Sequence, residues 1–156
     1  MRLTVAANWV EAPLKQFVDD AGVQLAVLLH PTGQVLGQFG FARSVDVMTA
    51  CALASATSAS SAALGQLVDG KPFRGVHYVG EERQLYLAPV PIEGGSLILL
   101  AVFDEESSLG IVQLFLQEFC AFVAAVAPPA SDGAVSLDND FERELNRNLA
   151  VMFGRA

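Results

Sequence analysis

The hydrophobic and polar positions of this 156-residue chain follow helical spacing in some stretches and strand-like spacing in others. Apolar residues three and four apart predict helices, and short apolar runs between glycine, proline or acidic turns predict strands. The run QLAVLLH has no polar residue between its ends, which is typical of a strand covered on both faces. The predicted elements are a helix at 8–20, strands at 24–30 and 35–41, a helix at 46–69, strands at 75–79, 84–92 and 96–103, and a helix at 109–126.

This order, α-β-β-α-β-β-β-α, predicts an α+β fold in which one five-stranded antiparallel sheet carries helices on both faces. Pro89 and Pro91 lack backbone N–H donors, which favours an edge or a bulge for their strand. We expect a folded domain at 8–127, a linker at 128–137 and an amphipathic tail helix at 138–153. Large apolar residues at helical spacing define one side of that tail helix: Phe141, Leu145, Leu149 and Met152.

The helix expected at 46–69 has no charged residue between Asp46 and Asp69. A serine-rich linker is one alternative, but linkers are richer in glycine and proline, and the repeated alanines favour a helix. A membrane span is another alternative, but the run has too many serines and too few bulky aliphatic residues. A surface helix normally carries charges on its outer side, so we expect both sides of this helix to be covered.

The two sides of this helix differ in the size of their residues. Larger residues are expected to lie on the sheet: Val47, Ala50, Leu53, Ala54, Thr57, Ser61, Leu64 and Val68. The opposite side is built from small residues: Ala52, Ser55, Ala56, Ala59, Ala62 and Ala63. Small side chains let another backbone approach closely, so we expect a second copy of the chain there, as a two-fold homodimer. The alternative is that the tail helix of the same chain folds over this side.

Composition and charge narrow the classes of partner. The chain is 53% hydrophobic and 17% charged, with a formal net charge of −8. This negative charge disfavours nucleic acid and anionic membranes, since binding to both depends on Lys and Arg. The N-terminus lacks the pattern of a secretory signal, so we expect a cytoplasmic protein without membrane insertion. Both cysteines, Cys51 and Cys120, lie in apolar helical patterns, which favours reduced, buried thiols.

A search for catalytic motifs gives little. The stretch GQLVDGK at 65–71 fits GxxxxGK, but Pro72 replaces the Ser or Thr that binds magnesium, and the stretch ends a helix instead of opening one. His30 and His77 have no Cys or carboxylate at ligand spacing. Serines 58, 60 and 61 lack the GxSxG motif of a nucleophile elbow. We therefore expect no catalytic residue, no metal site and no cofactor.

Two charged features have ordinary structural interpretations. The acidic run Asp104–Glu106 does not match calcium-loop spacing and is typical of a solvated turn before a helix, with Ser107 or Ser108 as the helix cap. Arg43 and Arg74 flank the uncharged helix, where an arginine finger toward a phosphate is conceivable. Solvated surface positions are the favoured interpretation for both arginines.

Several segments resemble the roadblock (dynein light chain) family, and within it the MglB group of bacterial gliding-motility regulators. They are the small-residue helix ending LGQLVDGKPF, the hairpin GEERQLY and the segment LAVFDEESSLGIV. The resemblance extends from the first helix to Val126, and a tail helix after a proline-containing linker also resembles this group. It implies homodimers in which the strands at 75–79 pair across the two-fold axis and the second helices lie side by side.

The resemblance also implies a partner and site residues. The paired second helices are expected to bind a Ras-like small GTPase of the MglA type and to promote GTP hydrolysis by arranging the GTPase's own catalytic residues. The implied dimer interface is Ala52, Ser55, Ala56, Ala59, Ala62, Ala63, Val76 and Tyr78, and the implied GTPase-binding residues are Ser55, Ala59, Ala62, Ala63 and Gln66. The implied tail contacts are Phe141, Leu145, Leu149 and Met152.

Two other functions stay open at this point. A passive dimeric adaptor would bind its partner without changing GTP turnover. A small-ligand sensor on a profilin-like sheet would need a polar pocket, which no motif indicates.

Overall fold

The computed structural model describes residues 8–128. The elements follow in the order that the sequence predicts, and they differ from their predicted bounds only at the ends. They are η1 Asn8–Val10, α1 Glu11–Ala21, β1 Leu25–Leu29, β2 Val35–Gly40, α2 Val47–Asp69, β3 Val76–Val79, β4 Gln84–Ile92, β5 Gly95–Phe103 and α3 Leu109–Val126. The tail helix expected at 138–153, and all of the linker except Pro128, lie outside the described residues.

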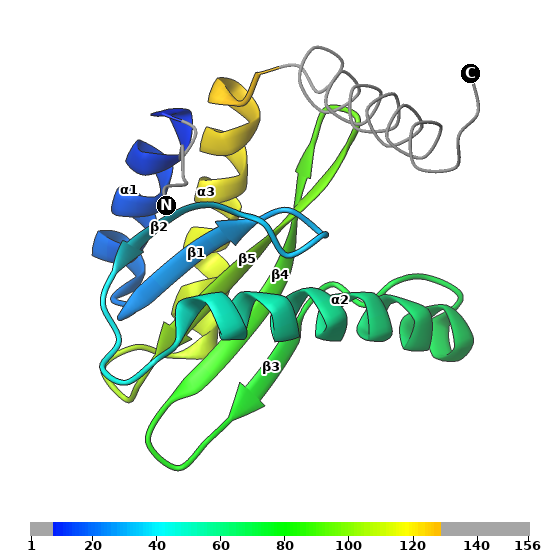
Figure 1. The fold of residues 1–156 in the computed structure, drawn as a ribbon, viewed down its shortest axis with the longest axis horizontal. Helices are drawn as coiled ribbons and strands as arrows, with labels where there is room; N and C mark the ends of the chain where they lie inside the picture. The colour runs from blue at the N-terminus through cyan, green and yellow to red at the C-terminus, as the bar shows by residue number, and fades with distance from the viewer. Residues whose placement is uncertain (1–7, 129–156) are drawn as a thin grey trace, which may run out of the picture. The chain divides into compact units, whose positions relative to one another are not determined.

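The strands form one sheet in the order β2-β1-β5-β4-β3 (Figure 1). Strand β1 pairs antiparallel with both β2 and β5, and β3 pairs antiparallel with β4. Helices α1 and α3 cover one face of the sheet, and α2 crosses the other (Figure 1). The predicted fold, a five-stranded antiparallel sheet with helices on both faces, is therefore confirmed.

The sheet separates two hydrophobic cores of different character. Every residue of β1 is buried, as the uninterrupted apolar run predicts for a strand covered on both faces. On the α1 and α3 face, the rings of Phe17 and Phe119 meet edge to face with centroids 5.5 Å apart. On the other face, α2 contributes only small buried residues, namely Cys51, Ala54 and Gly65. The α2 face is thus the more thinly packed of the two.

Both cysteines are free, as predicted. Cys51 is a buried residue of α2, and Cys120 is half-buried on α3. Burial raises the pKa of each thiol above its ordinary value, because the thiolate is poorly solvated there. Both side chains therefore act as small apolar residues of the core.

The prolines of β4 only partly follow the sequence prediction. Strand β4 lies inside the sheet, between β5 and β3, so the expected edge position is wrong for the strand as a whole. Strand β3, however, pairs only with the β4 residues from Gln84 to Leu87. Pro89 and Pro91 lie beyond this pairing, where a missing N–H donor costs no hydrogen bond to β3.

Helices α2 and α3 are long and apolar enough to cross a membrane by length and composition alone. Core helices pass the same test, and α3 packs Val112, Phe119 and Val123 against the sheet. Helix α2 also lies along the sheet, with Cys51 and Ala54 in the core. The share of each helix's 18-residue apolar window that is buried within the described residues is nevertheless small, 11% for α2 and 17% for α3, so each helix also exposes apolar surface.

Helix α2 begins at a side-chain cap and ends at a glycine. The Asp46 carboxylate accepts hydrogen bonds from the Thr49 backbone N–H at 3.3 Å and from the Thr49 hydroxyl at 2.7 Å. Gly70 ends the helix in the left-handed conformation, at φ 72°. The hydroxyl bond from Thr49, followed by its backbone bond, lowers the pKa of Asp46 below its ordinary value of 3.8.

The Asp46 cap predicts a pH dependence of stability. Because its pKa is lower in the folded chain, the carboxylate stabilises the fold above the unfolded pKa, and this contribution is lost as the pH falls through the folded pKa. Asp46→Ala should therefore lower the melting temperature at neutral pH, and the gap to wild type should narrow below about pH 4. Asp46→Asn, which keeps a capping oxygen, is the control and should lose less. A gap that stays constant down to about pH 2 would contradict this role.

Candidate functional site

Helix α2 is rotated relative to the sequence prediction. Three large residues expected on the sheet are exposed instead, namely Leu53 (63%), Leu64 (53%) and Val68 (70%). The residues that do face the sheet are smaller, with Cys51, Ala54 and Gly65 buried and Thr57 and Ser61 half-buried. These small residues let α2 approach the sheet closely. The three large residues instead lie on the side of the helix and at its C-terminal end. That part of the prediction is therefore wrong for Leu53, Leu64 and Val68.

Gly65 holds the segment that follows α2 against the helix. A Cβ atom at this position would lie 2.6 Å from the Lys71 carbonyl oxygen and 2.6 Å from the Phe73 backbone nitrogen. The chain therefore turns back at Gly70 and runs under the last turns of α2 before it enters β3. This return places Phe73 and Gly75 beside the helix.

The first hollow of α2 lies between the helix and β3, and we call it the β3-side groove. It has a volume of about 570 Å³. Its lining comes from one side of α2, from the returning segment and from β3: Leu53, Ala56, Thr57, Ser60, Ser61, Leu64, Phe73, Gly75, Val76, His77 and Tyr78. Strand β3 is the last strand of the sheet, so its outer edge is unpaired within residues 8–128. An apolar groove thus lies directly beside a free strand edge.

His77 lies on β3 beside this groove, but two contacts hold its side chain, and one of them is with the core on the α1 and α3 face. Its Nε2 lies 2.7 Å from the Gln84 side-chain oxygen, and its ring stacks on Phe103 with centroids 6.0 Å apart. His30 instead contacts the Thr32 hydroxyl in the β1–β2 turn, at 3.0 Å. Both histidines therefore support local structure, and the described part of the chain contains no cluster of potential metal ligands.

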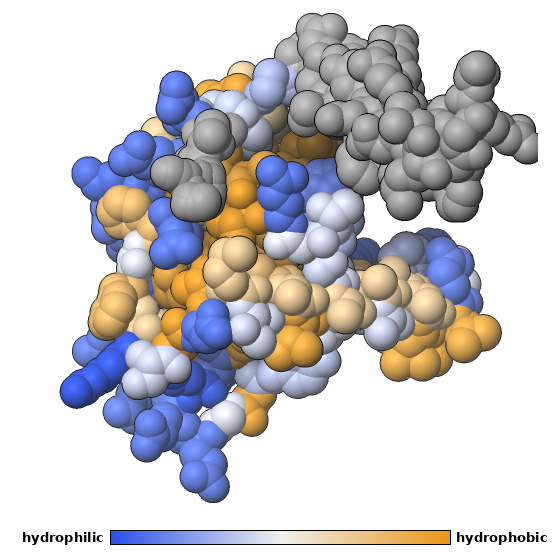
Figure 2. Space-filling model, in the orientation of Figure 1, coloured by the Kyte–Doolittle hydropathy of each residue, from blue (hydrophilic) through white to orange (hydrophobic). Residues whose placement is uncertain are grey.

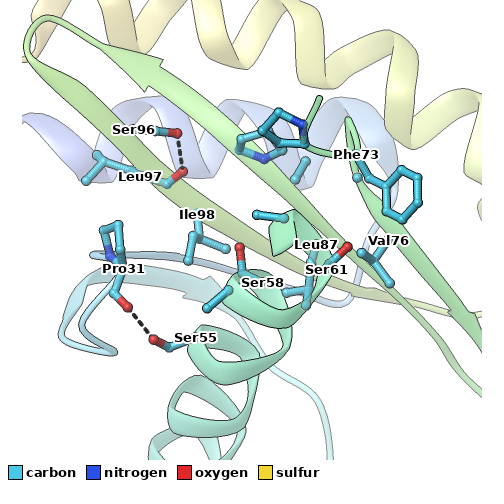
Figure 3. A pocket seen from close by; sticks show the side chains of 16 residues that line it. Pro31, Ser55, Ser58, Ser61, Phe73, Val76, Leu87, Ser96, Leu97 and Ile98 are labelled. Carbon is cyan, nitrogen blue, oxygen red and sulfur yellow. Dashed lines mark hydrogen bonds between the residues drawn. The ribbon is translucent and has the colours of Figure 1, made fainter. Parts of the chain in front are cut away.

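The second hollow lies on the other side of α2, and we call it the β5-side hollow (Figure 3). It has a volume of about 340 Å³. Ser58 and Ser61 on α2 face Leu87 and Ile98 on the sheet across this space, as Figure 3 shows. At one end, the Ser55 hydroxyl donates a hydrogen bond to the Pro31 carbonyl oxygen. None of the described residues that line the hollow is charged.

The structure divides the predicted site residues among three places. Ala56, Val76 and Tyr78 line the β3-side groove, whereas Ser55, Ala59 and Ala62 line the β5-side hollow. Ala52, Ala63 and Gln66 are exposed and line neither. The tail contacts Phe141, Leu145, Leu149 and Met152 lie outside the described residues.

Only Ala56, Val76 and Tyr78 of the groove were among the predicted site residues. The residues missing from the prediction are Leu53, Thr57, Ser60, Ser61, Leu64, Phe73, Gly75 and His77. Helical spacing alone assigned the two leucines to the core, because an apolar row on a helix usually faces its own sheet. The signal that could have found them is the width of the apolar row on α2. This row is wider than the face of the helix that the sheet covers. Figure 2 shows pale and orange residues along the visible side of α2, so this helix surface is largely uncharged.

The other candidate chemistry has structural roles. The GxxxxGK stretch is the end of α2 and its glycine cap, as predicted. Asp104 accepts hydrogen bonds from the Glu106 backbone at 3.0 Å and from the Gln24 side chain at 2.8 Å, which makes the acidic run a turn. Ser108 caps α3, whereas Ser107 donates to the Ala21 carbonyl oxygen at 2.6 Å. Arg43 and Arg74 are exposed.

This fold, with α1 and α3 on one face of the sheet and α2 on the other, resembles that of solved roadblock-type structures. No family model and no curated protein matches the sequence. Solved structures with this fold include MglB of Myxococcus xanthus, which is 21% identical with a TM-score of 0.68 over 78% of this chain and 97% of that one. The gliding protein MglB of Thermus thermophilus is 24% identical, with a TM-score of 0.69 over 81% and 94%. A Roadblock/LC7 domain from Streptomyces avermitilis is 19% identical, with a TM-score of 0.62 over 72% and 92%. At these identities the likeness establishes the fold, and the predicted roadblock resemblance is confirmed at that level.

Proposed function

We propose that this protein is a homodimeric regulator of a Ras-like small GTPase of the MglA type, without a catalytic centre of its own. The observation that carries the proposal is the free edge of β3 beside the apolar β3-side groove of α2, in a fold shared with MglB. The same fold and the same uncharged helix support placing the partner on α2. A cytoplasmic location follows, because the GTPase is a cytoplasmic protein in this proposal.

A second copy of the chain is the proposed occupant of the groove. The outer edge of β3 presents unpaired backbone N–H and C=O groups within the described residues, and Val79 on this strand is 71% exposed. Two such edges pair antiparallel about a two-fold axis, so that both sheets become one. The groove of each copy then receives the α2 flank of the other, which buries Leu53 and Leu64.

The GTPase is proposed to bind the outer surface of the paired α2 helices. Ala63 and Gln66 lie on this outer surface, and Ser55, Ala59 and Ala62 lie on the side of α2 that lines the β5-side hollow; all five are uncharged. Such residues allow close approach of switch segments, and the regulator acts by holding the GTPase's own catalytic residues in position. Arg43 and Arg74 have no assigned part in the reaction.

The proposal is tested by single-turnover GTP hydrolysis with the Ras-like GTPase encoded nearest to this gene. The full-length protein should accelerate phosphate release by about 10-fold or more, an effect well within what positioning contributes. Binding without acceleration would show a passive adaptor and overturn the activating role. A protein that binds none of the small GTPases of its own genome would overturn the whole proposal.

Ala63→Arg is expected to abolish most of the stimulation while leaving the homodimer intact. The resemblance implies Ala63 for both the dimer interface and the GTPase-binding surface. Because Ala63 is exposed on α2 and lies outside the β3-side groove, a long charged side chain there blocks the GTPase and spares the dimer proposed here. The rate enhancement should fall by about 10-fold, equal to roughly 1.4 kcal/mol of lost docking. Ala121→Arg, on an exposed position of α3, is the matched control and should behave as wild type. Equal stimulation by both variants would remove Ala63 from the docking surface.

A further inference from the structure

The β5-side hollow is a space that α2 crosses without filling. Ser58, Ser61 and Ala62 line it from the helix, and all three have short side chains. Leu87 and Ile98 on the sheet form the opposite wall (Figure 3). The volume of about 340 Å³ between them falls within the usual size range of small-molecule pockets, ~300–1,000 Å³. The hollow is therefore large enough for a small ligand.

Contacts at both ends of the hollow hold it open. At one end, the Ser55 hydroxyl donates a hydrogen bond to the Pro31 carbonyl oxygen. A Cβ atom at Gly33 in the same turn would lie 3.7 Å from the Ser55 Cβ and 3.8 Å from the Ala52 Cα, so this turn packs directly on the helix. Beyond the other end, Gly65 packs on the segment that returns toward β3. Because α2 is fixed on both sides of the hollow, its middle cannot move onto the sheet and fill the space.

The lining combines apolar walls with two available hydroxyl groups. Most of the described lining residues are apolar, and none is charged. The hydroxyls of Ser55 and Ser96 already donate hydrogen bonds to backbone carbonyl oxygens. Ser58 and Ser61 are half-buried, and no described lining residue is hydrogen-bonded to their hydroxyls (Figure 3). A few polar groups in an otherwise apolar cavity are the usual features of a small-molecule site.

We propose that the β5-side hollow binds a small, uncharged, mainly apolar molecule with one hydrogen-bonding oxygen. The apolar part lies against the sheet, and the oxygen bonds to the hydroxyl of Ser58 or Ser61. The lining extends along α2 from Ser55 to Ala62, a length of ~10 Å at the helical rise per residue, which suits a medium-length alkyl chain. Neither the fold nor the proposed GTPase regulation assigns a ligand to this hollow.

The described residues favour this ligand over two other occupants. A charged molecule would lose its hydration without gaining a partner, because Lys71 and Arg74, next to the lining segment, are exposed and do not line the hollow. A second copy is proposed to occupy the β3-side groove, where Leu53 and Leu64 lie, so the β5-side hollow stays outside that interface.

Ligand binding also has a regulatory consequence, which rests on the proposed function. Ser55, Ala59 and Ala62 line the hollow and belong to the proposed GTPase-binding surface as well. A bound ligand would therefore change the surface that the GTPase meets on this side of α2.

The test is a titration of the full-length protein with 1-octanol, without any GTPase, so its outcome does not depend on the proposed function. In methyl NMR spectra, the signals of Leu87 and Ile98 should shift and show nuclear Overhauser contacts to the octanol chain, because both side chains line the hollow. Contacts to Leu53 and Leu64 instead would place octanol in the β3-side groove and overturn the proposal. Unshifted signals of Leu87 and Ile98 would overturn it as well.

Two variants locate the binding site. Ala62→Phe fills the hollow and should weaken octanol binding by about 10-fold or more, whereas Ala121→Phe, on an exposed position of α3, should bind as wild type does. Ser58→Ala/Ser61→Ala keeps good helix formers and should weaken binding by about 5-fold, the loss of roughly one hydrogen bond. Melting temperatures show that each variant is folded. Wild-type affinity in the serine variant would contradict the assigned hydrogen bond and overturn the proposal.

The two other occupants are distinguished by charge and by concentration. Octanoate has the same chain length but carries a carboxylate, so it should bind at least about 10-fold more weakly than octanol. Octanoate that binds as tightly as octanol would indicate a charged ligand and contradict the proposal. An octanol affinity that falls as the protein concentration rises would assign the hollow to a second copy and likewise overturn it.

Discussion

Leu64→Glu is expected to split the homodimer. Leu64 lines the β3-side groove and is half-exposed in the single chain, so a second copy would bury it. A buried leucine contributes about 1.5–3 kcal/mol, and an unpaired carboxylate in the same place adds a desolvation cost. Since each copy carries the change, the dimer dissociation constant should rise by at least about 100-fold. Sedimentation velocity over a range of concentrations measures this shift.

Met48→Glu provides the matched control for this result. Met48 is also a large exposed apolar residue of α2, but it lies outside both hollows. This variant should sediment as wild type does. A wild-type protein that sediments as a single chain at micromolar concentration, or equal behaviour of Leu64→Glu and wild type, would refute the proposed interface.

Gly65→Ala is expected to lower the stability of the fold markedly. The added methyl group would lie 2.6 Å from two backbone atoms of the segment after α2, and neither atom belongs to a flexible side chain. Overpacking of this kind costs about 1–3 kcal/mol. A loss of this size lowers the melting temperature of a chain of this length by roughly 3–10 °C. Thermal unfolding followed by circular dichroism measures it.

Gly110→Ala is the matched control, because it makes the same change in the other long helix. Among the described residues, the only atom near a Cβ at Gly110 is the Ser108 hydroxyl oxygen, 4.0 Å away, and the residue is exposed. Alanine is favoured over glycine inside helices by about 1 kcal/mol, so this variant should be as stable as wild type or more stable. Equal melting temperatures for the two variants would mean that the segment after α2 does not pack on Gly65.

Local patterns were sufficient to predict the elements and their order. The apolar run of β1, the acidic turn before α3 and the Gly70 stop of α2 each act within a few residues of the chain. Antiparallel pairing followed from short turns, and the burial of β1 on both faces followed from its lack of polar residues. The roadblock resemblance rested on such stretches, which explains why it held at the level of the fold.

The site was less predictable, because it depends on the rotation of one helix. The apolar row of α2 is wider than the face that the sheet covers, so periodicity could not decide which part of it stays outside. Leu53 and Leu64 were assigned to the core, and the structure places them in the groove beside β3. The position of β3 at the end of the sheet was also not predictable from local patterns, because it depends on pairing between strands that are distant in the sequence.

The sequence by itself determined the elements, the helix caps and the uncharged nature of α2, because capping, turn formation and periodicity are local. Only the tertiary structure decided which side of α2 lies beside β3 and which lies over β5. That choice depends on how closely the residues Cys51, Ala54 and Gly65 let the helix approach the sheet, and on the chain segment that returns under Gly65. The approach of α2 to the sheet and the packing of the returning segment are both contacts between residues that only folding brings together. No local sequence pattern predicts either of them.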